Sequence, residues 1–570
     1  MTENEIYELV VQMNKEKNVE FVSNETDGRT YVGKIFVQGN ECKLEISFPK
    51  TFPLSLPEIR VIFPQKRFAH MGSDGKLCLL DRSSLLINNT FPERILIECF
   101  ESACNILAID INSDEYAKEL LREFNSYWFA NSTLEIYSAL EEKCYGYSEL
   151  KMYISGRIRV LALSLSEAKY LGCNYLKAID DEKAFSTNCI VISLRKNSRP
   201  IVLKASYRWS EVRRYILENV PNATKKKFKK FLNSYGADLM RYIVLSLPEE
   251  SGNVLFGFRV HFSNRKKEKL EKVINAKVEP VYVKRIDRSY MLQRSGAENV
   301  ISSKSVLLMG CGSIGGYIAN NLCQLGIGSI DFIDDDVFSK ENVHRHFLGF
   351  DALVGKTHNK AVLLKNRLEE MYPYVDIDSL DYKERSVESY LCDTRKLSNY
   401  DLIISALGEP TLNIEINRIL YEEQINTPFI CCFNEPYGIG GHAIVSNIAR
   451  DTCLRCLYTD SISSDLVLFR GSFVKANQNF KKNISGCSSA FVPYSCLDSQ
   501  QTAIVVSKIA VKVLKKEIGD NEIHSWVGED SRLIEEGFLT SEFFNAHKND
   551  AAFKMKIPNA RYCPICNIGK

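Results

Sequence analysis

The sequence predicts a multidomain α/β and α+β protein, with an N-terminal α+β domain, a central mixed linker domain and a C-terminal doubly wound α/β domain. The first observation is length, because 570 residues at roughly 150 per domain correspond to three or four domains. The second is the order of the predicted helices and strands along the chain. A helix and alternating strand-like runs come first, and a strand, a glycine-rich turn, a helix and another strand follow after residue 281. We place the domains at residues 1–145, 146–280 and 281–570.

The composition excludes several classes of protein. Hydrophobic residues make up 45% and charged residues 25% of the chain, which excludes wholesale disorder. The net charge of +2 gives no case for a nucleic-acid or membrane partner, and no apolar run approaches the roughly 20 residues of a membrane helix. The acidic, amphipathic N-terminus is unlike a signal peptide. We therefore expect a cytoplasmic protein whose 18 cysteines stay reduced and available for metal binding or chemistry.

The N-terminal domain opens with an amphipathic helix over about the first 18 residues. Strands are predicted over Thr30–Phe36 and Cys42–Phe48, where apolar and polar residues alternate. A proline-punctuated segment and helical patterns from Glu93 onward follow.

The central domain mixes strands, predicted over Ile190–Leu194 and Pro200–Ala205, with a basic run over Lys225–Lys230. Five lysines around Phe228 are typical of a solvated helix face with one buried aromatic side chain.

A nucleotide site is predicted where the C-terminal domain begins its doubly wound, Rossmann-like pattern. The strand Ser305–Met309 leads into a glycine-rich turn and a helix, and glycines let the backbone approach a phosphate at the helix N-terminus. The strand Ser329–Ile333 then ends at Asp334, whose carboxylate is placed to bind a ribose hydroxyl. The glycines of the turn are Gly310, Gly312 and Gly315.

Two cations narrow this prediction. Arg345 lies eleven residues after Asp334, and Lys360 follows it. A hydride-transfer enzyme needs no such cations beside a pyrophosphate. An enzyme that splits ATP between the α and β phosphates does, because negative charge builds on both fragments.

The segment from Asp334 to Arg345, together with the upstream glycines, resembles the ThiF/MoeB/ubiquitin-activating superfamily over most of residues 281–570. The resemblance implies ATP as cofactor, with Asp334 on its ribose and Asn342, Arg345 and Lys360 on its phosphates. Lys356 is an alternative to Lys360.

The resemblance also implies a symmetric homodimer and a Mg²⁺ ion. Arg288, in a segment similar to the family's Arg-Tyr-x-Arg, would reach the ATP of the partner subunit. The family's Thr-Asp-Asn motif, whose Asp helps to hold Mg²⁺, is missing. Glu409 is the nearest carboxylate to that position.

A zinc site is predicted from two CxxC pairs that lie 107 residues apart. Each pair can place two thiolates on one tetrahedral metal, and four together close a structural Zn²⁺ site. The ligands are Cys453, Cys456, Cys563 and Cys566.

The resemblance places a thioester-forming cysteine between these pairs, where Cys487 and Cys496 both lie. Cys487 follows a glycine in a polar stretch of small residues, as an exposed nucleophile should. Cys496 precedes an apolar helix predicted over about Thr502–Leu514, and we expect it to be a packed or capping-region residue. We choose Cys487 and keep Cys496 as the alternative.

Residues 1–145 resemble a ubiquitin-conjugating enzyme through a proline-rich segment before a strand and the run from His70 to Asp81. The resemblance implies that Cys78 forms a thioester. The family's His-Pro-Asn has become His70-Met71-Gly72, which removes an amide that supports the oxyanion. We expect His70 to structure its loop rather than act as a base.

An activating and a conjugating module in one chain predict a relay of an acyl group from Cys487 to Cys78 and then to a lysine of a target protein. The substrate would be a protein C-terminus that ends in glycine, because only glycine threads a narrow backbone channel. The domain order resembles the fused enzymes of bacterial CBASS antiphage operons, which implies a cGAS-like nucleotidyltransferase as the conjugated protein. Three alternatives stay open: a sulfur-carrier adenylator, a nucleotide-dependent oxidoreductase and a non-catalytic scaffold.

Overall fold

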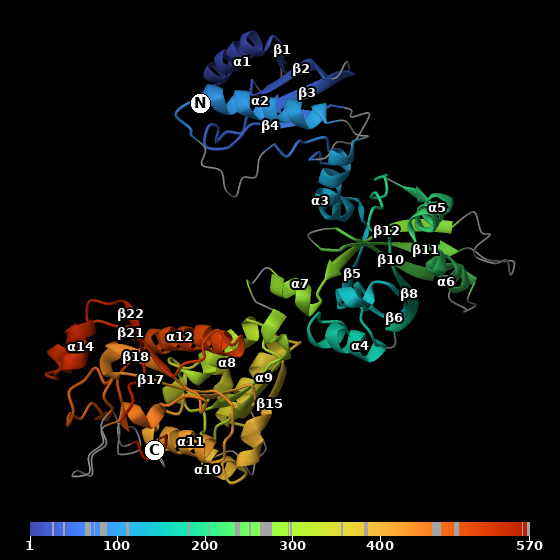
Figure 1. The fold of residues 1–570 in the computed structure, drawn as a ribbon. Helices are drawn as coiled ribbons and strands as arrows, with labels where there is room; N and C mark the ends of the chain where they lie inside the picture. The colour runs from blue at the N-terminus through green and yellow to red at the C-terminus, as the bar shows by residue number, and fades with distance from the viewer. Residues whose placement is uncertain are drawn as a thin grey trace. The chain divides into compact units, whose positions relative to one another are not determined.

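The computed structural model consists of two compact units, Met1–Asp287 and Arg288–Lys570 (Figure 1). It describes residues 1–570 with gaps at 25–27, 38–39, 63–69, 73, 80–87, 110–112, 180–182, 205, 234–239, 250–251, 263–275, 294–295, 297–298, 355–356, 381–385, 459–468, 484–489, 561–562 and 567–570. No helix within the described ranges is both long enough and apolar enough to cross a bilayer.

The first part of unit 1 is an antiparallel sheet of order β1-β2-β3-β4 with helices packed on it (Figure 1). The helix α1 (Glu3–Lys17) begins at Thr2, whose side chain and that of Glu5 cap each other's backbone N–H groups. It packs on α2 (Pro92–Ala108) through one apolar face. The strands are β1 (Glu20–Ser23), β2 (Thr30–Val37), β3 (Asn40–Ser47) and β4 (Glu58–Val61), which confirms the two predicted strands within two residues.

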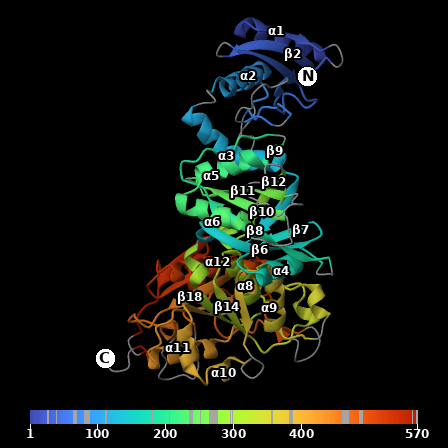
Figure 2. The ribbon, with the colours of Figure 1, turned by 90° about the vertical axis from the view of Figure 1, so that its right-hand side faces the viewer.

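The second part of unit 1 is an eight-stranded sheet of order β11-β10-β8-β6-β7-β5-β12-β9, in which β11 also pairs with β12. Figure 2 shows its helices, among which α4 contacts β6 and β7. The strands are β5 (Leu134–Ser138), β6 (Tyr147–Ser155), β7 (Ile158–Leu161), β8 (Phe185–Ser193), β9 (Tyr207–Arg208), β10 (Met240–Leu247), β11 (Val254–Phe262) and β12 (Ala276–Arg285). The helices are α3 (Asp114–Asn131), α4 (Leu165–Asn174), α5 (Trp209–Asn219) and α6 (Asn222–Asn233).

The strand predicted over Pro200–Ala205 is wrong. Residues 201–204 have no regular secondary structure, and Ala205 lies outside the described residues. The hydroxyl of Tyr207 bonds the carbonyl of Val202 and the N–H of Lys204, so a side chain takes the place of a neighbouring strand. The basic run does form a helix, α6, in which Phe228 is fully buried among exposed or half-buried lysines.

Unit 2 is built on an eight-stranded sheet of order β15-β14-β13-β16-β17-β18-β21-β22. The first five strands run parallel and the last three add antiparallel pairs. These strands are β13 (Ser305–Met309), β14 (Ser329–Ile333), β15 (Asp376–Ser379), β16 (Leu402–Ser405), β17 (Phe429–Asn434), β18 (Gly440–Ser446), β21 (Glu522–Val527) and β22 (Ala552–Lys556). A small separate pair is formed by β19 (Lys482–Asn483) and β20 (Ala490–Phe491).

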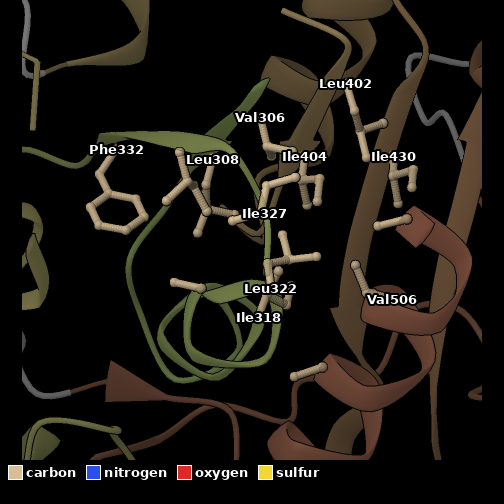
Figure 3. Packing of buried hydrophobic residues seen from close by; sticks show 14 of the residues in the cluster. Val306, Leu308, Ile318, Leu322, Ile327, Phe332, Leu402, Ile404, Ile430 and Val506 are labelled. Carbon is tan, nitrogen blue, oxygen red and sulfur yellow. The ribbon is translucent and has the colours of Figure 1, made fainter. Parts of the chain in front are cut away.

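The helices of unit 2 cover the sheet, and two of them frame the core in Figure 3. Val306 and Leu308 of β13 pack toward α8 and α12, whereas Leu307 and Met309 point to the opposite face, as the two-residue period of a strand requires. The helices are α7 (Arg288–Gln293), α8 (Gly315–Gln324), α9 (Lys360–Met371), α10 (Val387–Tyr390), α11 (Pro410–Glu422), α12 (Cys496–Leu514), α13 (Ser531–Glu535) and α14 (Glu542–His547). The helix predicted from about Thr502 is α12, which begins six residues earlier.

Candidate functional site

The glycine-rich turn between β13 and α8 folds because two of its positions exclude any larger residue. Gly310 has a φ of +91°, which L side chains rarely adopt. A Cβ at Gly315 would lie 1.9 Å from the carbonyl oxygen of Gly310. Gly312 instead faces open space and lines a cavity. The predicted glycine roles are thus distinct: two shape the turn and one leaves room for a ligand.

Asp334, at the end of β14, fixes this turn by accepting a hydrogen bond from its backbone. Its Oδ2 accepts the N–H of Cys311 at 2.6 Å and its Oδ1 accepts the N–H of Asp336 at 2.8 Å. Burial raises the pKa of Asp334, although these two N–H groups and Lys360 oppose that change. A carboxylate has about four lone-pair sites, so capacity remains for a ribose hydroxyl.

The cation-bearing segment lies beside the turn. Lys360 begins α9, is 8% exposed, and places its Nζ 2.7 Å from Oδ2 of Asp336. The amide oxygen of Asn342 accepts the backbone N–H of Ser339 at 3.0 Å and fixes the preceding turn. The guanidinium of Arg345 makes no hydrogen bond or ion pair with any described residue, whereas its backbone N–H donates to the carbonyl of Asn342 at 3.0 Å. The charge of this side chain is therefore available to a ligand.

A cavity of about 770 Å³ brings these residues together at the C-terminal edge of the parallel strands. Gly312, Asn342, Arg345 and Lys360 line it. Gly310, Gly315 and Asp334 shape its turn without lining it, and Lys356 lies outside the described residues. Aromatic side chains form much of the remaining wall, namely Phe433, Tyr458, Phe469, Phe491 and Tyr494.

Arg288 lies elsewhere in unit 2. Its Nη2 donates to the carbonyls of Gly326 and Ile327, at 2.7 and 2.6 Å, just beyond the end of α8. A cation is stabilised at a helix C-terminus by the exposed carbonyls. Its contact with the ATP of a partner subunit stays a prediction.

Two groups of this cavity were not predicted from the sequence. His346 is 5% exposed, its Nε2 lies 2.6 Å from the carbonyl of Cys311, and its Nδ1 accepts the N–H of Leu348 at 3.1 Å. Burial lowers the pKa of His346 to about 4, so the ring is neutral and Nε2 carries the proton. It supports the glycine turn without adding charge.

The second unpredicted group is a buried Glu435–His442 pair, with Nε2 of His442 3.1 Å from Oε1 of Glu435. That same oxygen accepts the N–H of Phe473 at 2.9 Å, and the ring of Phe473 contacts the imidazole edge to face. Glu435 lines the cavity, so the pair ties the segment near residue 473 to its floor. Glu409 is the other carboxylate among the described lining residues and is exposed.

The four cysteines of the CxxC pairs converge although the pairs are far apart in sequence. All four sulfurs lie within 4.8 Å of one another. The Sγ atoms of Cys453 and Cys563 are 3.6 Å apart, and those of Cys456 and Cys566 are 3.3 Å apart. Four thiolates around zinc at about 2.3 Å would be about 3.8 Å apart. The cluster therefore fits a tetrahedral metal after small adjustments.

Of the two candidates for the first thioester cysteine, the structure describes only Cys496. Cys487 lies outside the described residues. Cys496 is the first residue of α12, directly after the N-cap Ser495, whose side chain and that of Asp498 form a capping box. This is the capping-region position expected of Cys496.

Cys78 is exposed and follows a tight turn after β4. Gly75 in this turn has a φ of +83°, and a Cβ there would lie 2.3 Å from the carbonyl oxygen of Val61. The N–H of Cys78 donates to the carbonyl of His70 at 2.7 Å. Cys78 lines a cavity of about 1190 Å³ whose walls come from β4, the turn, α2 and α3. An exposed thiol at a large cavity has the access that acyl transfer between proteins requires.

Comparison with known proteins finds similarity in two parts of the chain. Residues 286–525 match the ThiF family, and residues 10–136 match prokaryotic E2 family B. The chain is 24% identical to the ATP-dependent ubiquitin transferase-like protein Cap2 of Pseudomonas aeruginosa (strain BWHPSA011 / Pa011), over 98% of each chain. It is 22% identical to the protein of the same name from Escherichia coli (strain TW11681), over 92% of this chain and 89% of that one. Among solved structures, E. coli MccB with ATP matches 49% of this chain and 69% of its own, with 16% identity and a TM-score of 0.33.

Proposed function

We propose that the chain is an ATP-dependent adenylating and conjugating enzyme, in which a part similar to prokaryotic E2 family B works with a part similar to the ThiF family. It relays a protein C-terminus through two cysteines to a target amine. One observation carries this proposal: the same chain has a cavity with an unpaired arginine beside a glycine turn and a second cavity with an exposed cysteine. An adenylator that makes a free thiocarboxylate would need only the first.

Adenylation is assigned to the cavity of unit 2. The substrate carboxylate attacks the α-phosphorus of ATP and pyrophosphate leaves. Arg345 and Lys360 stabilise the charge that develops on both fragments, and Asn342 positions the phosphates. Asp334 binds the ribose, and the backbone at Gly312 lets a phosphate approach the start of α8.

The Mg²⁺ that accompanies ATP would be held by Glu409 together with the phosphates. Glu435, the other described carboxylate of the cavity, is already engaged by His442 and by the N–H of Phe473. Mg²⁺ would neutralise phosphate charge there.

Acyl transfer follows in three steps. Cys487 displaces AMP to give a thioester, and Cys78 accepts the acyl group by transthioesterification before a target lysine takes it as an isopeptide. The substrate is a protein with a C-terminal glycine, by resemblance a cGAS-like nucleotidyltransferase. The Cap2 relatives support the transfer chemistry, since they are named ATP-dependent ubiquitin transferase-like proteins.

Three further features complete the proposal. Zn²⁺ would be held by the four clustered cysteines, where it would join the C-terminal residues to the segment at Cys453. The enzyme acts as a homodimer in which Arg288 reaches the ATP of the partner subunit. It works in the cytoplasm, where ATP is present and thiols stay reduced.

The test is the intact mass of the protein after incubation with ATP and a candidate substrate, measured with and without reductant. We expect an ATP-dependent adduct with the mass of the substrate minus water, lost on reduction. A protein that releases pyrophosphate but forms no thiol-sensitive adduct would be an adenylator of another kind.

A further inference from the structure

The cavity that Cys78 lines contains a contact between a histidine and a carboxylate that the proposed relay does not use. Nε2 of His70 lies 3.5 Å from Oε2 of Glu119, and both side chains are partly exposed to the cavity, at 29% and 26%. The two residues are 49 positions apart in the sequence, so the contact is made by the fold. Oε1 of Glu119 is held in turn by Nη1 of Arg122 at 2.6 Å.

The backbone of His70 is fixed next to the backbone of Cys78. His70 has a φ of +61°, its carbonyl accepts the N–H of Cys78 at 2.7 Å, and its own N–H donates to the hydroxyl of Tyr127. These contacts agree with the loop-structuring role expected from the sequence. They also leave the imidazole in the cavity that Cys78 lines.

The helix α3 positions the carboxylate. Glu119, Glu123 and Tyr127 follow each other at four-residue intervals and line the cavity. Phe124 and Trp128 lie on another face and are fully buried in the core of the eight-stranded sheet. The carboxylate that meets His70 is therefore held by the central part of unit 1 and not by the loop that carries Cys78.

We propose that His70, which the sequence alone led us to expect only as a loop-structuring residue, is also a catalytic residue of the conjugation step, and that Glu119 is the positioning residue that orients it. The proposal rests on the proposed function, because it assumes a thioester on Cys78. A carboxylate at Nε2 favours a proton on that nitrogen and leaves the lone pair on Nδ1. His70 can then act as general base toward an incoming amine.

The step balances without any further reactant. The neutral amine nitrogen of the acceptor attacks the thioester carbonyl carbon, and a C–N bond forms while Nδ1 of His70 takes one N–H proton. The C–S bond breaks, Cys78 leaves as a thiolate, and the imidazolium returns the proton to that sulfur. The products are an amide and a free thiol.

The test uses the full chain acylated at Cys78 by a synthetic glycine-ended peptide thioester, which bypasses ATP and Cys487. Acylation of other cysteines is subtracted with Cys78→Ala. Discharge is followed by intact mass with Nα-acetyllysine or with hydroxylamine, which is a strong nucleophile that needs no base. Because this charging step is separate from the relay, failure of ATP-dependent loading would contradict the proposed function and leave the discharge result to decide this inference.

We expect His70→Gly to slow discharge to Nα-acetyllysine by about 100-fold or more. Glycine accommodates the positive φ of this position, and added imidazole should restore the rate by entering the space left by the ring. Hydroxylamine discharge should change by less than about twofold, as for an unassisted reaction. His70→Gln should behave like His70→Gly but without rescue by imidazole.

Glu119→Gln should slow lysine discharge by about tenfold, the size of effect expected when one contact to a charged group is lost, and imidazole should not restore it. The matched control is Glu123→Gln, the same substitution one turn along the same cavity wall, which should stay near the wild-type rate. Lysine discharge at the wild-type rate in His70→Gly would overturn the proposal. An equal loss of His70→Gly discharge with lysine and with hydroxylamine, without rescue by imidazole, would also overturn it. Equal slowing of lysine discharge by Glu119→Gln and Glu123→Gln would do the same.

Discussion

The two cavities of this protein are built from different scaffolds. The cavity of unit 2 lies where parallel strands end, and its Lys360 is about nine-tenths buried beside a fixed glycine turn. The cavity of unit 1 lies between a turn and two helices, and its Cys78 is exposed. Charge stabilisation during ATP cleavage favours preorganised, sheltered groups, whereas a thioester that passes between proteins needs access. The difference in burial therefore follows the difference in chemistry.

The largest expected effect is on the sheltered cavity. Arg345→Ala should reduce ATP–pyrophosphate exchange by at least about 100- to 1000-fold, because it removes a charge that no described residue compensates. Charging of Cys78 by a synthetic thioester should not change. The matched control is Arg367→Ala, in which an exposed arginine paired with Glu370 is removed. Exchange near the wild-type rate in folded Arg345→Ala would contradict the assignment of the ATP site.

A second prediction concerns the metal that would hold unit 2 together. Cys563→Ser should lower the zinc content below one ion per chain and destabilise unit 2 by roughly 3 kcal/mol. Unit 1 should keep its unfolding transition. Metal analysis and calorimetry measure both effects, with the exposed Cys392→Ser as control. Protein purified without chelator that contains no zinc would remove the four-cysteine site from the account.

A smaller effect depends on pH. Burial lowers the pKa of His346 from 6.5 to about 4. Between these two pH values the ring is protonated in the unfolded state and neutral in the folded state. The stability contributed by the neutral ring is present above about pH 6.5 and is lost as the pH falls toward 4, by up to about 3 kcal/mol. His346→Gln should reduce this loss of stability at low pH. The loss is measured by calorimetry in the unfolding transition that ATP binding shifts. An equal loss between pH 7 and pH 5 in both proteins would show that His346 is not the group responsible.

Local signals in the sequence predicted much of the fold. The strands β13 and β14 have the predicted bounds because their buried runs are flanked by glycine or aspartate. The strand predicted over Pro200–Ala205 does not form. The hydroxyl of Tyr207 bonds the carbonyl of Val202 and the N–H of Lys204, and no local sequence pattern reveals this contact. The early start of α12 follows from the capping box of Ser495 and Asp498, a spacing that is present in the sequence.

The candidate sites also contain some residues that local motifs predict and others that only the fold brings together. Short motifs predicted the cations that line the cavity of unit 2, and two CxxC pairs predicted the four cysteines that cluster. His346 was missed although it adjoins Arg345, since a histidine becomes a neutral support only when its surroundings bury it. The contacts of Glu435 with His442 and of His70 with Glu119 join separate elements, and only the fold shows them.

The relay from unit 2 to Cys78 is tested most directly by the two cysteine variants incubated with ATP and substrate, with adducts mapped by mass spectrometry. Cys487→Ala should still exchange pyrophosphate but form no reductant-sensitive adduct on either domain. Cys78→Ala should keep an adduct on the C-terminal domain and lose both the N-terminal adduct and the isopeptide product. Normal conjugation by Cys78→Ala, or loading of Cys78 in Cys487→Ala, would contradict the relay. If loading were lost in Cys496→Ala instead, the relay would stand with Cys496 as its first cysteine.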